Sequence, residues 1–218
     1  LWSDTLKDKV NSAYHYGEEK KAGGGLTLAK VIVEDMVGLP IHYVLLIDFS
    51  GFENIIDIVG GIDINVSRAF TDAEFPIAGR ENDLCDGDPT FACRYESVSF
   101  TSGSQHMNGE TALTYIRSRH AEGNEGSDFA RSRRQQEVLV ALQEKLRNPS
   151  TWLPPSRAFI LFEAFNRASQ TDMRIGELAT VGKVIVKIGS GEERRISFVD
   201  FLIEPPLWMY GRYTLVPK

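Results

Sequence analysis

The sequence predicts an α/β fold in which a central mixed β-sheet is covered by α-helices on both faces, because helical patterns alternate with short strand-like segments. A chain of 218 residues with 42% hydrophobic content can build one sizeable core. The sequence contains no internal repeat and no low-complexity stretch. We therefore expect residues 1–218 to form a single domain.

The first predicted helix and strand follow the mostly polar residues 1–20. Residues 26–37 place apolar side chains at helical spacing, and Gly38 and Pro40 end that pattern. Residues 43–47 form a short continuous apolar run, which is typical of a central strand buried on both faces. This stretch therefore supplies one covering helix and one strand of the sheet.

A second helix and strand follow Asp48. Ser50 is placed to cap a short amphipathic helix over residues 51–59, and a pair of glycines stops that helix. Residues 62–66 alternate between apolar and polar side chains, as a strand with one wet face does. We interpret Asp48 as part of this architecture, and a catalytic role for Asp48 is the alternative.

Residues 67–104 are rich in turn residues and poor in apolar ones, which predicts a long surface excursion with a brief strand over 97–100. Cys85 and Cys93 lie inside it. A structural zinc ion needs four ligands, so this isolated pair is a poor zinc site and a disulfide is the better interpretation. A disulfide would place the protein in an oxidising compartment. Two reduced thiols in a cytosolic protein are the alternative.

The second half of the chain contains further helical and strand-like patterns. Asn108 is placed to cap one helix, and Asp128 is placed to cap the next. Residues 157–168 are apolar on nearly all sides, so that helix must be covered by the core or by an apolar ligand. The predicted helices span 108–116, 128–148, 157–168 and 173–188, and the predicted strands span 196–203 and 213–216.

Charged and amide side chains gather where the helix over 108–116 ends and the next helix begins. Arg117 and Arg119 are separated by one residue, so they share a face if the chain is extended there. Asp128, Arg131 and Gln135 lie on one stripe of the following helix. That stripe continues into apolar residues and is expected to face the core: Val138 or Leu139, Leu142 and Leu146.

This cluster carries more positive charge than Asp128 alone can neutralise. Guanidinium groups match phosphate oxygens, and a helix N-terminus adds free N–H groups and a partial positive charge. The pattern therefore predicts a phosphate or pyrophosphate site, and a plain salt-bridge network is the alternative. His106 and His120 have no patterned carboxylate partners, so we interpret them as ordinary polar residues and not as metal ligands.

Residues 108–119 run into Asp128-Phe129-Ala130-Arg131 and close on Arg134-Gln135-Gln136, and this combination resembles the signature of the LytR-CpsA-Psr family of cell-wall enzymes. The resemblance implies an α-β-α sandwich and a cell-envelope phosphotransferase on the outer side of the cytoplasmic membrane. Such an enzyme moves a glycopolymer from a polyprenyl-pyrophosphate carrier to peptidoglycan or a related wall acceptor. The loop over 120–127 is longer than is usual in the family.

The resemblance also implies roles for individual residues. Arg117 and Arg119 would clamp the pyrophosphate and stabilise charge on the leaving phosphate. Asp128 would orient an arginine or assist acid–base chemistry, and these three form the predicted catalytic set. Arg131 and Gln135 would bind phosphate oxygens together with the arginine pair.

The family uses Mg²⁺ held by two aspartates in segments that precede those found in this chain. We therefore expect an N-terminally shortened family member whose metal ligands lie outside these residues, and we assign no metal ligand here. Asp4 in particular is not assigned, because residues 7–14 follow it almost at once and come later in the family's order.

Composition excludes two other classes. The net charge of −6 argues against a general nucleic-acid binder, which needs an excess of Lys and Arg. No run approaches the ~18–20 apolar residues of a membrane span, so any membrane association would come from a segment absent from this chain. Two alternatives to the enzyme are a non-catalytic polyprenyl-pyrophosphate binding module and a structural wall protein whose arginines pair with Glu122, Glu125 and Asp128.

Overall fold

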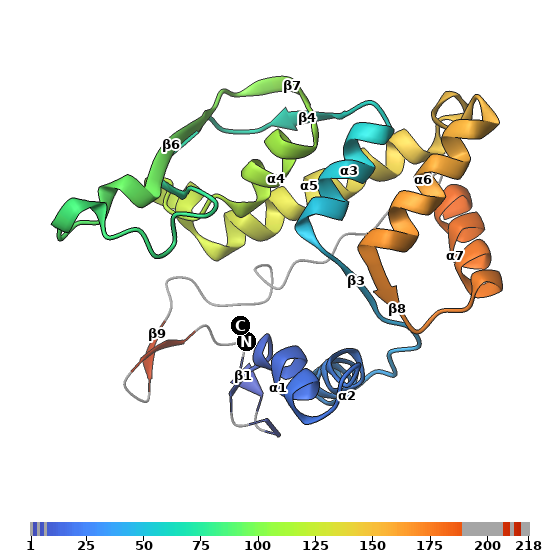
Figure 1. Ribbon diagram of the computed structural model, residues 1–218, viewed down its shortest axis with the longest axis horizontal. Coiled ribbons are helices and arrows are strands. Elements are labelled where there is room, and N and C mark those ends of the chain that lie inside the picture. Colours follow the sequence, from blue (N-terminus) through green and yellow to red (C-terminus); the bar gives the residue numbers. More distant parts are fainter. Residues whose placement is uncertain (1, 4, 7, 189–206, 210–211, 215–218) are drawn as a thin grey trace. The chain divides into compact units, whose positions relative to one another are not determined.

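The computed structural model describes residues 2–3, 5–6, 8–188, 207–209 and 212–214 (Figure 1). Helices alternate with short strands along these residues, so the predicted α/β class is confirmed. Within the described ranges the strands pair two by two.

Two compact units make up the chain, and the chain enters each of them more than once. The first unit consists of Leu1–Asp63, His106–Leu113 and Ala141–Val186, and the second consists of Ile64–Gln105, Thr114–Val140 and Lys187–Lys218. Helix α5, Asp128–Arg147, contributes residues to both units. Each unit therefore depends on contacts between segments that are far apart in sequence.

The helices of the first unit follow the predicted pattern closely. Helix α2 spans Gly25–Val37, and Gly38 ends it with a φ of 66°, a left-handed conformation that favours glycine. The preceding helix α1, Ser12–Lys20, lies beside α2 (Figure 1). This unit also contains α3 (Phe49–Ile58), α6 (Pro155–Ala168) and most of α7 (Ile175–Ile188).

The strands of the first unit are short. Strand β3, Leu45–Ile47, pairs in antiparallel fashion with β8, Ser169–Thr171, and β1 (Trp2–Ser3) pairs likewise with β2 (Asp8–Lys9). The prediction that the 43–47 run is buried on both faces is wrong, because Leu45 is 44% exposed. An apolar run predicts that a segment forms a strand. Whether other segments cover that strand depends on the tertiary structure.

Helices α3 and α6 pack side by side (Figure 1). Asp48 caps α3, since its Oδ1 accepts a hydrogen bond of 2.7 Å from the N–H of Gly51, so the predicted cap at Ser50 is wrong. The architectural interpretation of Asp48 agrees with this contact. The apolar side chains between the helices are Ile55, Val59 and Leu161, with Ile58, Leu142, Leu146 and Phe165 packed against them.

The predicted burial of α6 on nearly all sides is not found. Leu161 is buried, but the exposed fractions of Phe159, Ile160 and Phe162 are 63%, 51% and 48%. The sequence shows that these positions are apolar, and only the contacts of α6 show that one face of the helix is covered.

The second unit is built around a hairpin that the sequence did not predict in full. Strand β5, Phe70–Pro76, pairs in antiparallel fashion with β6, Tyr95–Phe100, and the register shifts between Asp72 and Phe75. Strand β4, Ile62–Val66, pairs with β7, Gly103–Met107, and alternates buried and exposed residues as predicted. The surface excursion over 67–104 is therefore more regular than its turn-rich composition indicates.

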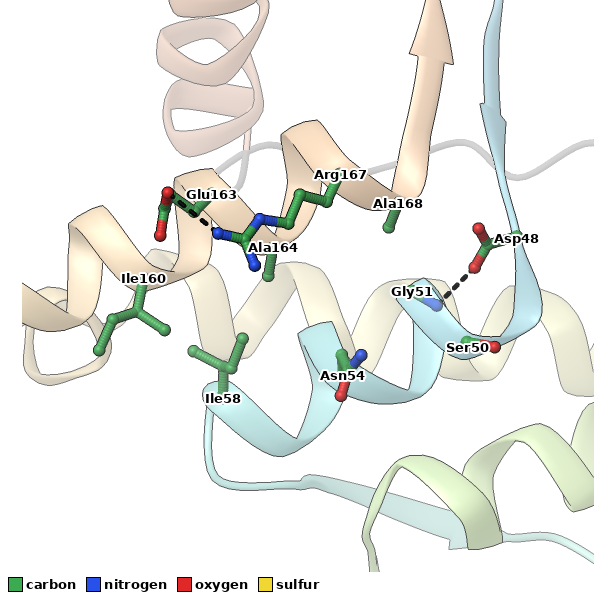
Figure 2. Close-up of a pocket in the computed structure, with 10 residues that line it drawn as sticks. All are labelled: Asp48, Ser50, Gly51, Asn54, Ile58, Ile160, Glu163, Ala164, Arg167 and Ala168. Atoms are coloured by element: carbon green, nitrogen blue, oxygen red, sulfur yellow. Dashed lines mark hydrogen bonds and ion pairs between the residues drawn. The ribbon is translucent and has the colours of Figure 1, made fainter.

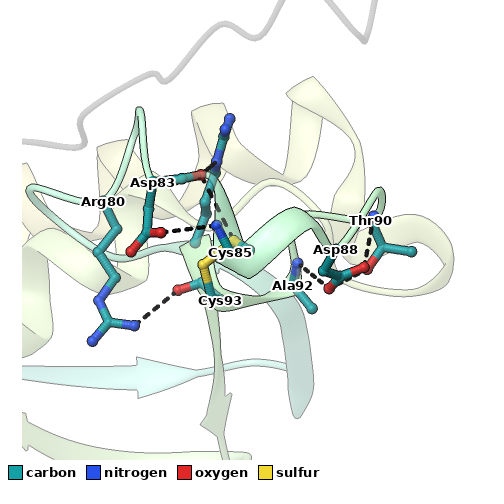
Figure 3. Close-up of a disulfide and its surroundings, with 8 residues drawn as sticks. Arg80, Asp83, Cys85, Asp88, Thr90, Ala92 and Cys93 are labelled. Carbon is teal, nitrogen blue, oxygen red and sulfur yellow. Dashed lines mark hydrogen bonds between the residues drawn. A yellow bond between two sulfur atoms is a disulfide. The ribbon is translucent and has the colours of Figure 1, made fainter.

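A disulfide closes the loop between β5 and β6 (Figure 3). Cys85 and Cys93 are bonded, with their Cα atoms 5.5 Å apart, which confirms the predicted pairing. Two 3₁₀ turns, η1 (Cys85–Gly87) and η2 (Ala92–Arg94), carry the cysteines. The Nε of Arg94 donates to the carbonyl of Asp83 at 2.7 Å and ties the two sides of the loop together.

The remaining elements are α4 (Gly109–Arg117), η3 (Gly123–Gly126), η4 (Pro149–Trp152), β9 (Leu207–Met209) and β10 (Arg212–Thr214). Among them, α4 lies near its predicted position, whereas η3, η4 and β9 were not predicted. Strand β10 pairs with β9 and covers the start of the last predicted strand. The strand predicted over 196–203 lies outside the described residues.

We predict that Gly51→Ala lowers the free energy of unfolding by about 1–3 kcal/mol, the usual effect of overpacking. A Cβ at position 51 would lie 1.9 Å from the Cβ of Ala168 and push α3 away from α6. Gly182→Ala in α7 is the matched control, because a Cβ there meets no atom within 4 Å and would raise stability by up to ~1 kcal/mol. Urea denaturation of both variants gives the comparison, and equal stabilities would contradict the close approach of the helices.

We also predict that replacing both Cys85 and Cys93 by Ala lowers the free energy of unfolding by about 2–3 kcal/mol, the loop-closure entropy of so short a loop. Thiol labelling of the unfolded, unreduced wild-type protein should find no free thiol. Two labelled cysteines in protein exported through an oxidising compartment would contradict the pairing.

Candidate functional site

The predicted arginine pair lies where α4 ends and the chain becomes extended, within the second unit. Ser118, between the two arginines, is fully buried. The next two backbone N–H groups, those of Arg119 and His120, donate to one carboxylate oxygen of Asp72 at 2.8 and 3.2 Å. Asp72 on strand β5 thus anchors the extended segment.

Asp72 is itself fully buried. Its second carboxylate oxygen accepts a hydrogen bond of 3.0 Å from the N–H of Glu74. A buried carboxylate is tolerated when N–H donors surround it, and bonds to a charged acceptor are stronger than bonds between neutral groups. The carboxylate of Asp72 is therefore occupied by backbone groups.

Arg134 on helix α5 approaches the same segment with a side chain that is fully buried. Its guanidinium donates to three backbone carbonyls, those of Tyr115 at 3.0 Å, Ser118 at 2.7 Å and Glu125 at 2.9 Å. The carboxylate of Glu125 lies 3.4 Å from the same guanidinium. One side chain therefore binds the end of α4, the extended segment and the turn before α5.

Aromatic rings cover the guanidinium of Arg134. Its central carbon lies 4.7 Å from the centre of the Phe70 ring and 5.8 Å from that of Tyr115. The rings of Phe70, Phe100 and Tyr115 also pack on one another, with centres 5.1 to 5.9 Å apart. Burial lowers the pKa of Arg134, and the charge of Glu125 opposes that shift. Arginine side chains stay protonated in proteins.

Further ion pairs surround this buried arginine. Arg133 binds both carboxylate oxygens of Glu125 at 2.7 and 2.8 Å, and these hydrogen bonds raise the pKa of Arg133. The hydroxyl of Tyr115 donates to Glu137 at 2.7 Å, and burial, followed by this bond, raises the pKa of Tyr115. Arg133 is therefore paired with an acid.

The predicted pyrophosphate ligands lie in different environments. Arg119 is exposed, and it takes part in none of the ion pairs among the described residues. Arg117 is half-buried, with its guanidinium 5.5 Å from the centre of the Phe75 ring. The structure therefore places one arginine in solvent and the other against an aromatic face.

The head of α5 differs from the prediction in its cap. Asp128 is the first residue of the helix, and Ser127 caps it by accepting from the N–H of Ala130 at 3.2 Å. Asp128 instead pairs with Arg131 at 2.8 Å, and its side chain is 82% exposed. Asp128 and Arg131 are thus neighbours as predicted, with Asp128 in solvent and the side chain of Arg131 only 23% exposed.

The buried stripe of α5 differs from the predicted one in the first half of the helix. Gln135 and Leu139 are exposed, whereas Ala130, Arg134 and Val138 are buried at four-residue spacing. The expectation of a core-facing position is therefore wrong for Asp128 and Gln135, whereas the side chain of Arg131 is only 23% exposed. The physical reason is that Arg134, one position from Gln135, finds three carbonyls and an aromatic cover on the inner side. The apolar continuation of the predicted stripe is confirmed, because Val138 is buried and Leu142 and Leu146 pack against the core cluster of Ile55, Val59 and Leu161.

Sequence reasoning missed Asp72 altogether and named Arg134 in the motif without giving it a role. Glu125 was named as an arginine partner in the structural alternative, and it pairs with Arg133 and Arg134. The row Ala130, Arg134 and Val138 is visible as an i, i+4 pattern, but an arginine is rarely assigned to a core row. Asp72 carries no such signal, because its partners are 47 and 48 residues away in sequence.

No group of three or more close candidate ligands among the described residues suits Mg²⁺. Their one group of three close candidate ligands is Asp83, Cys85 and Cys93, and both cysteines are in the disulfide. Mg²⁺ prefers oxygen ligands in octahedral geometry, which this group does not offer. We therefore derive no step through a metal. His106 binds Asp63 at 2.8 Å and belongs to no such group within the described part of the chain, and Asp4 lies outside it.

A separate hollow of about 320 Å³ lies between α3 and α6 in the first unit (Figure 2). Asp48, Asn54 and Arg167 are among its lining residues. Arg167 is paired with Glu163 at 3.3 Å and Asp48 is engaged in its cap, as the dashed lines in Figure 2 show. The polar groups of this hollow are thus largely used within the protein.

No helix in the described part of the chain is both long and apolar enough to cross a membrane.

We predict that Arg134→Met lowers the free energy of unfolding by about 3–5 kcal/mol, because it leaves three carbonyls and part of the Glu125 charge without a buried donor. Arg131→Met is the matched control, since its partner Asp128 is largely exposed and the loss should be ~0–1 kcal/mol. Chemical denaturation measures both. A loss at Arg134 no larger than that at Arg131 would refute the structural importance of the buried guanidinium.

Comparison with known proteins identifies the family of this chain. The LytR_cpsA_psr family model matches residues 2–211. TagU of Bacillus cereus is 29% identical over 138 residues, which cover 63% of this chain and 35% of TagU. TagV of Bacillus subtilis is 29% identical over 185 residues, which cover 85% of this chain and 39% of TagV. Both relatives are named polyisoprenyl-teichoic acid–peptidoglycan teichoic acid transferases.

The crystal structure of B. subtilis TagV is similar to the fold, with a TM-score of 0.63 and 25% sequence identity over 97% of this chain and 69% of that chain. The matched part of this chain covers well under half of the length of the two curated relatives, TagU and TagV. The family match extends over nearly all of its residues and confirms the resemblance seen in the arginine motif. The chain belongs to the LytR_cpsA_psr family.

Proposed function

We propose that this chain forms the pyrophosphate-binding part of a cell-envelope phosphotransferase, which moves a glycopolymer from a polyprenyl-pyrophosphate carrier to peptidoglycan or a related wall acceptor. The observation that carries the proposal is the exposed guanidinium of Arg119 on a backbone held by buried charges. The names of the relatives TagU and TagV support the same donor and acceptor classes.

The chemistry of such a transfer leaves little covalent work to the protein. A hydroxyl oxygen of the acceptor attacks the phosphorus that bears the glycan, the bridging P–O bond breaks, and the prenyl phosphate leaves with the bonding electrons. The acceptor's proton passes to a base. Positioning and charge stabilisation are the protein's contributions, and they act on the phosphate oxygens as negative charge shifts to the leaving group.

In this proposal Arg119 and Arg117 bind the oxygens of the pyrophosphate. The first turn of α5 adds a helix N-terminus, and Arg131, oriented by Asp128 at 2.8 Å, adds a third guanidinium. Gln135 is exposed on the same helix and donates a neutral hydrogen bond. The exposure of Asp128 also suits a role in accepting the acceptor's proton.

The alternative is a structural wall protein in which acidic side chains neutralise the arginines, and the ion pairs of the structure bear on this alternative. Arg131, Arg133 and Arg134 each pair with an acid. Arg119 does not do so within the described residues, and this supports an anionic ligand over a closed salt-bridge network. The disulfide between Cys85 and Cys93 supports an extracytoplasmic location, because such bonds persist in oxidising compartments.

We predict that Arg119→Ala weakens the binding of geranyl pyrophosphate by roughly 1.5–3 kcal/mol, the contribution of a hydrogen bond to a charged group. Arg157→Ala is the control, because Arg157 is an exposed arginine on α6 and its removal changes the net charge equally. Arg133→Ala is unsuitable, since it would break the bonds to Glu125. Calorimetric titration measures the affinities, and equal losses in the two variants would contradict the assignment.

A transfer assay separates an enzyme from a non-catalytic binder. With a polyprenyl-pyrophosphate-linked glycan and peptidoglycan, the enzyme transfers glycan to the wall and releases prenyl phosphate. Arg119→Ala should reduce this rate while Arg157→Ala leaves it unchanged. Tight binding of geranyl pyrophosphate without transfer, in protein extended to the length of its relatives, would establish the binding module instead.

A further inference from the structure

We propose that Asp72 is a positioning residue that acts through Arg119. Its buried carboxylate fixes the orientation of the peptide group from which the Arg119 side chain extends. This inference rests on the proposed role of Arg119 as a ligand of pyrophosphate, and it adds a residue that the arginine motif does not contain.

The buried carboxylate of Asp72 is unable to reach a ligand. The side chain is fully buried, and both carboxylate oxygens accept hydrogen bonds from backbone N–H groups, one from Glu74 and the other from Arg119 and His120. An effect of Asp72 on binding must therefore pass through the groups it holds.

Both polar ends of the peptide group that joins Ser118 to Arg119 are bonded to buried side chains. Its N–H donates to Asp72 at 2.8 Å, and its carbonyl oxygen accepts from Arg134 at 2.7 Å. The N–H and C=O bonds of a trans peptide point in opposite directions. A buried anion and a buried cation therefore hold the two ends of one rigid plane, which restricts rotation about the bonds on either side of it.

The segment that carries Arg119 is also linked to strand β5. Asp72 also forms an isolated antiparallel bridge with Ala121, so the extended segment pairs with β5 just before the register shift at Asp72 and Phe75. The segment that carries Arg119 is therefore attached to the hairpin by backbone and side chain together. Its exposed guanidinium starts from a fixed Cα, which reduces the conformational entropy lost when it binds an anion.

The position of the carboxylate also matters for charge. An exposed acid beside Arg119 would compete with a phosphate for the guanidinium. Asp72 instead uses its charge on backbone N–H groups and forms none of the ion pairs among the described residues. The site thus gains a rigid anchor without losing positive charge at the surface.

The test is Asp72→Asn. An asparagine presents one oxygen and one NH₂ group, so it must turn a donor toward at least one set of backbone N–H groups that Asp72 accepts. We expect the amide hydrogens of Arg119 and His120 to be protected from exchange in the wild-type protein and to exchange much faster in the variant. We expect geranyl pyrophosphate to bind roughly ten-fold more weakly to the variant, equivalent to 1.4 kcal/mol.

Asp86→Asn is the matched control, because Asp86 is an exposed aspartate in the disulfide loop of the same unit and its substitution removes the same charge. It should alter neither readout. A double-mutant cycle adds the decisive comparison: in the Arg119→Ala background, Asp72→Asn should weaken binding no further, because Asp72 acts only through Arg119.

The outcomes are distinguishable. Additive losses from Asp72→Asn and Arg119→Ala would overturn the positioning role while leaving the proposed function intact. A wild-type protein that fails to bind geranyl pyrophosphate would overturn the proposed function and this inference with it. Should Asp72→Asn fail to fold, exchange in the wild-type protein decides, because Arg119 and His120 amides that exchange as fast as those of exposed Glu122 and Gly123 would refute the anchor.

Discussion

The peptide group between Ser118 and Arg119 lies between two buried charges of opposite sign, and the geometry of the candidate site depends on this arrangement. Asp72 accepts from its N–H and Arg134 donates to its carbonyl oxygen. Neither charge would be tolerated alone, because an unpaired buried ion is strongly unfavourable. Here each ion is surrounded by backbone dipoles, and Arg134 also has Glu125 and the Phe70 ring close to it.

This arrangement divides the arginines of one short stretch by role. Arg134 is structural, since it is fully buried and binds three carbonyls. Arg133 holds the carboxylate of Glu125, and Arg131 is paired with Asp128 at the surface. Arg119 keeps an exposed guanidinium on a fixed backbone. A motif rich in arginine can therefore build its own support and still present positive charge to an anion.

The first unit shows a different constraint, in which close packing of backbone sets the geometry. The Gly51 turn of α3 passes so close to Ala168 of α6 that a Cβ would overlap it. Asp48 stabilises this turn as the N-cap of α3, which is a structural role. Among the polar groups that line the hollow between these helices, Asp48 and the Glu163–Arg167 pair have partners within the protein.

Local pattern was enough to predict much of this protein. The helices near 26–37, 157–168 and 173–188, the alternating strand at 62–66 and the disulfide between Cys85 and Cys93 are read from periodicity, turn residues and cysteine spacing, all of which act over a few residues. The arginine motif likewise identified the family, because its residues lie at short, fixed offsets.

Tertiary structure alone decided which polar residues are buried. Sequence periodicity placed Arg131 and Gln135 on the stripe expected to face the core, with Arg134 one position away from Gln135 on the helix. The choice of Arg134 follows from carbonyls at 115, 118 and 125 and from a ring at position 70. Asp72 meets Arg119 only when β5 folds beside the end of α4. Burial of a charge depends on partners distant in sequence, so no local pattern could reveal it.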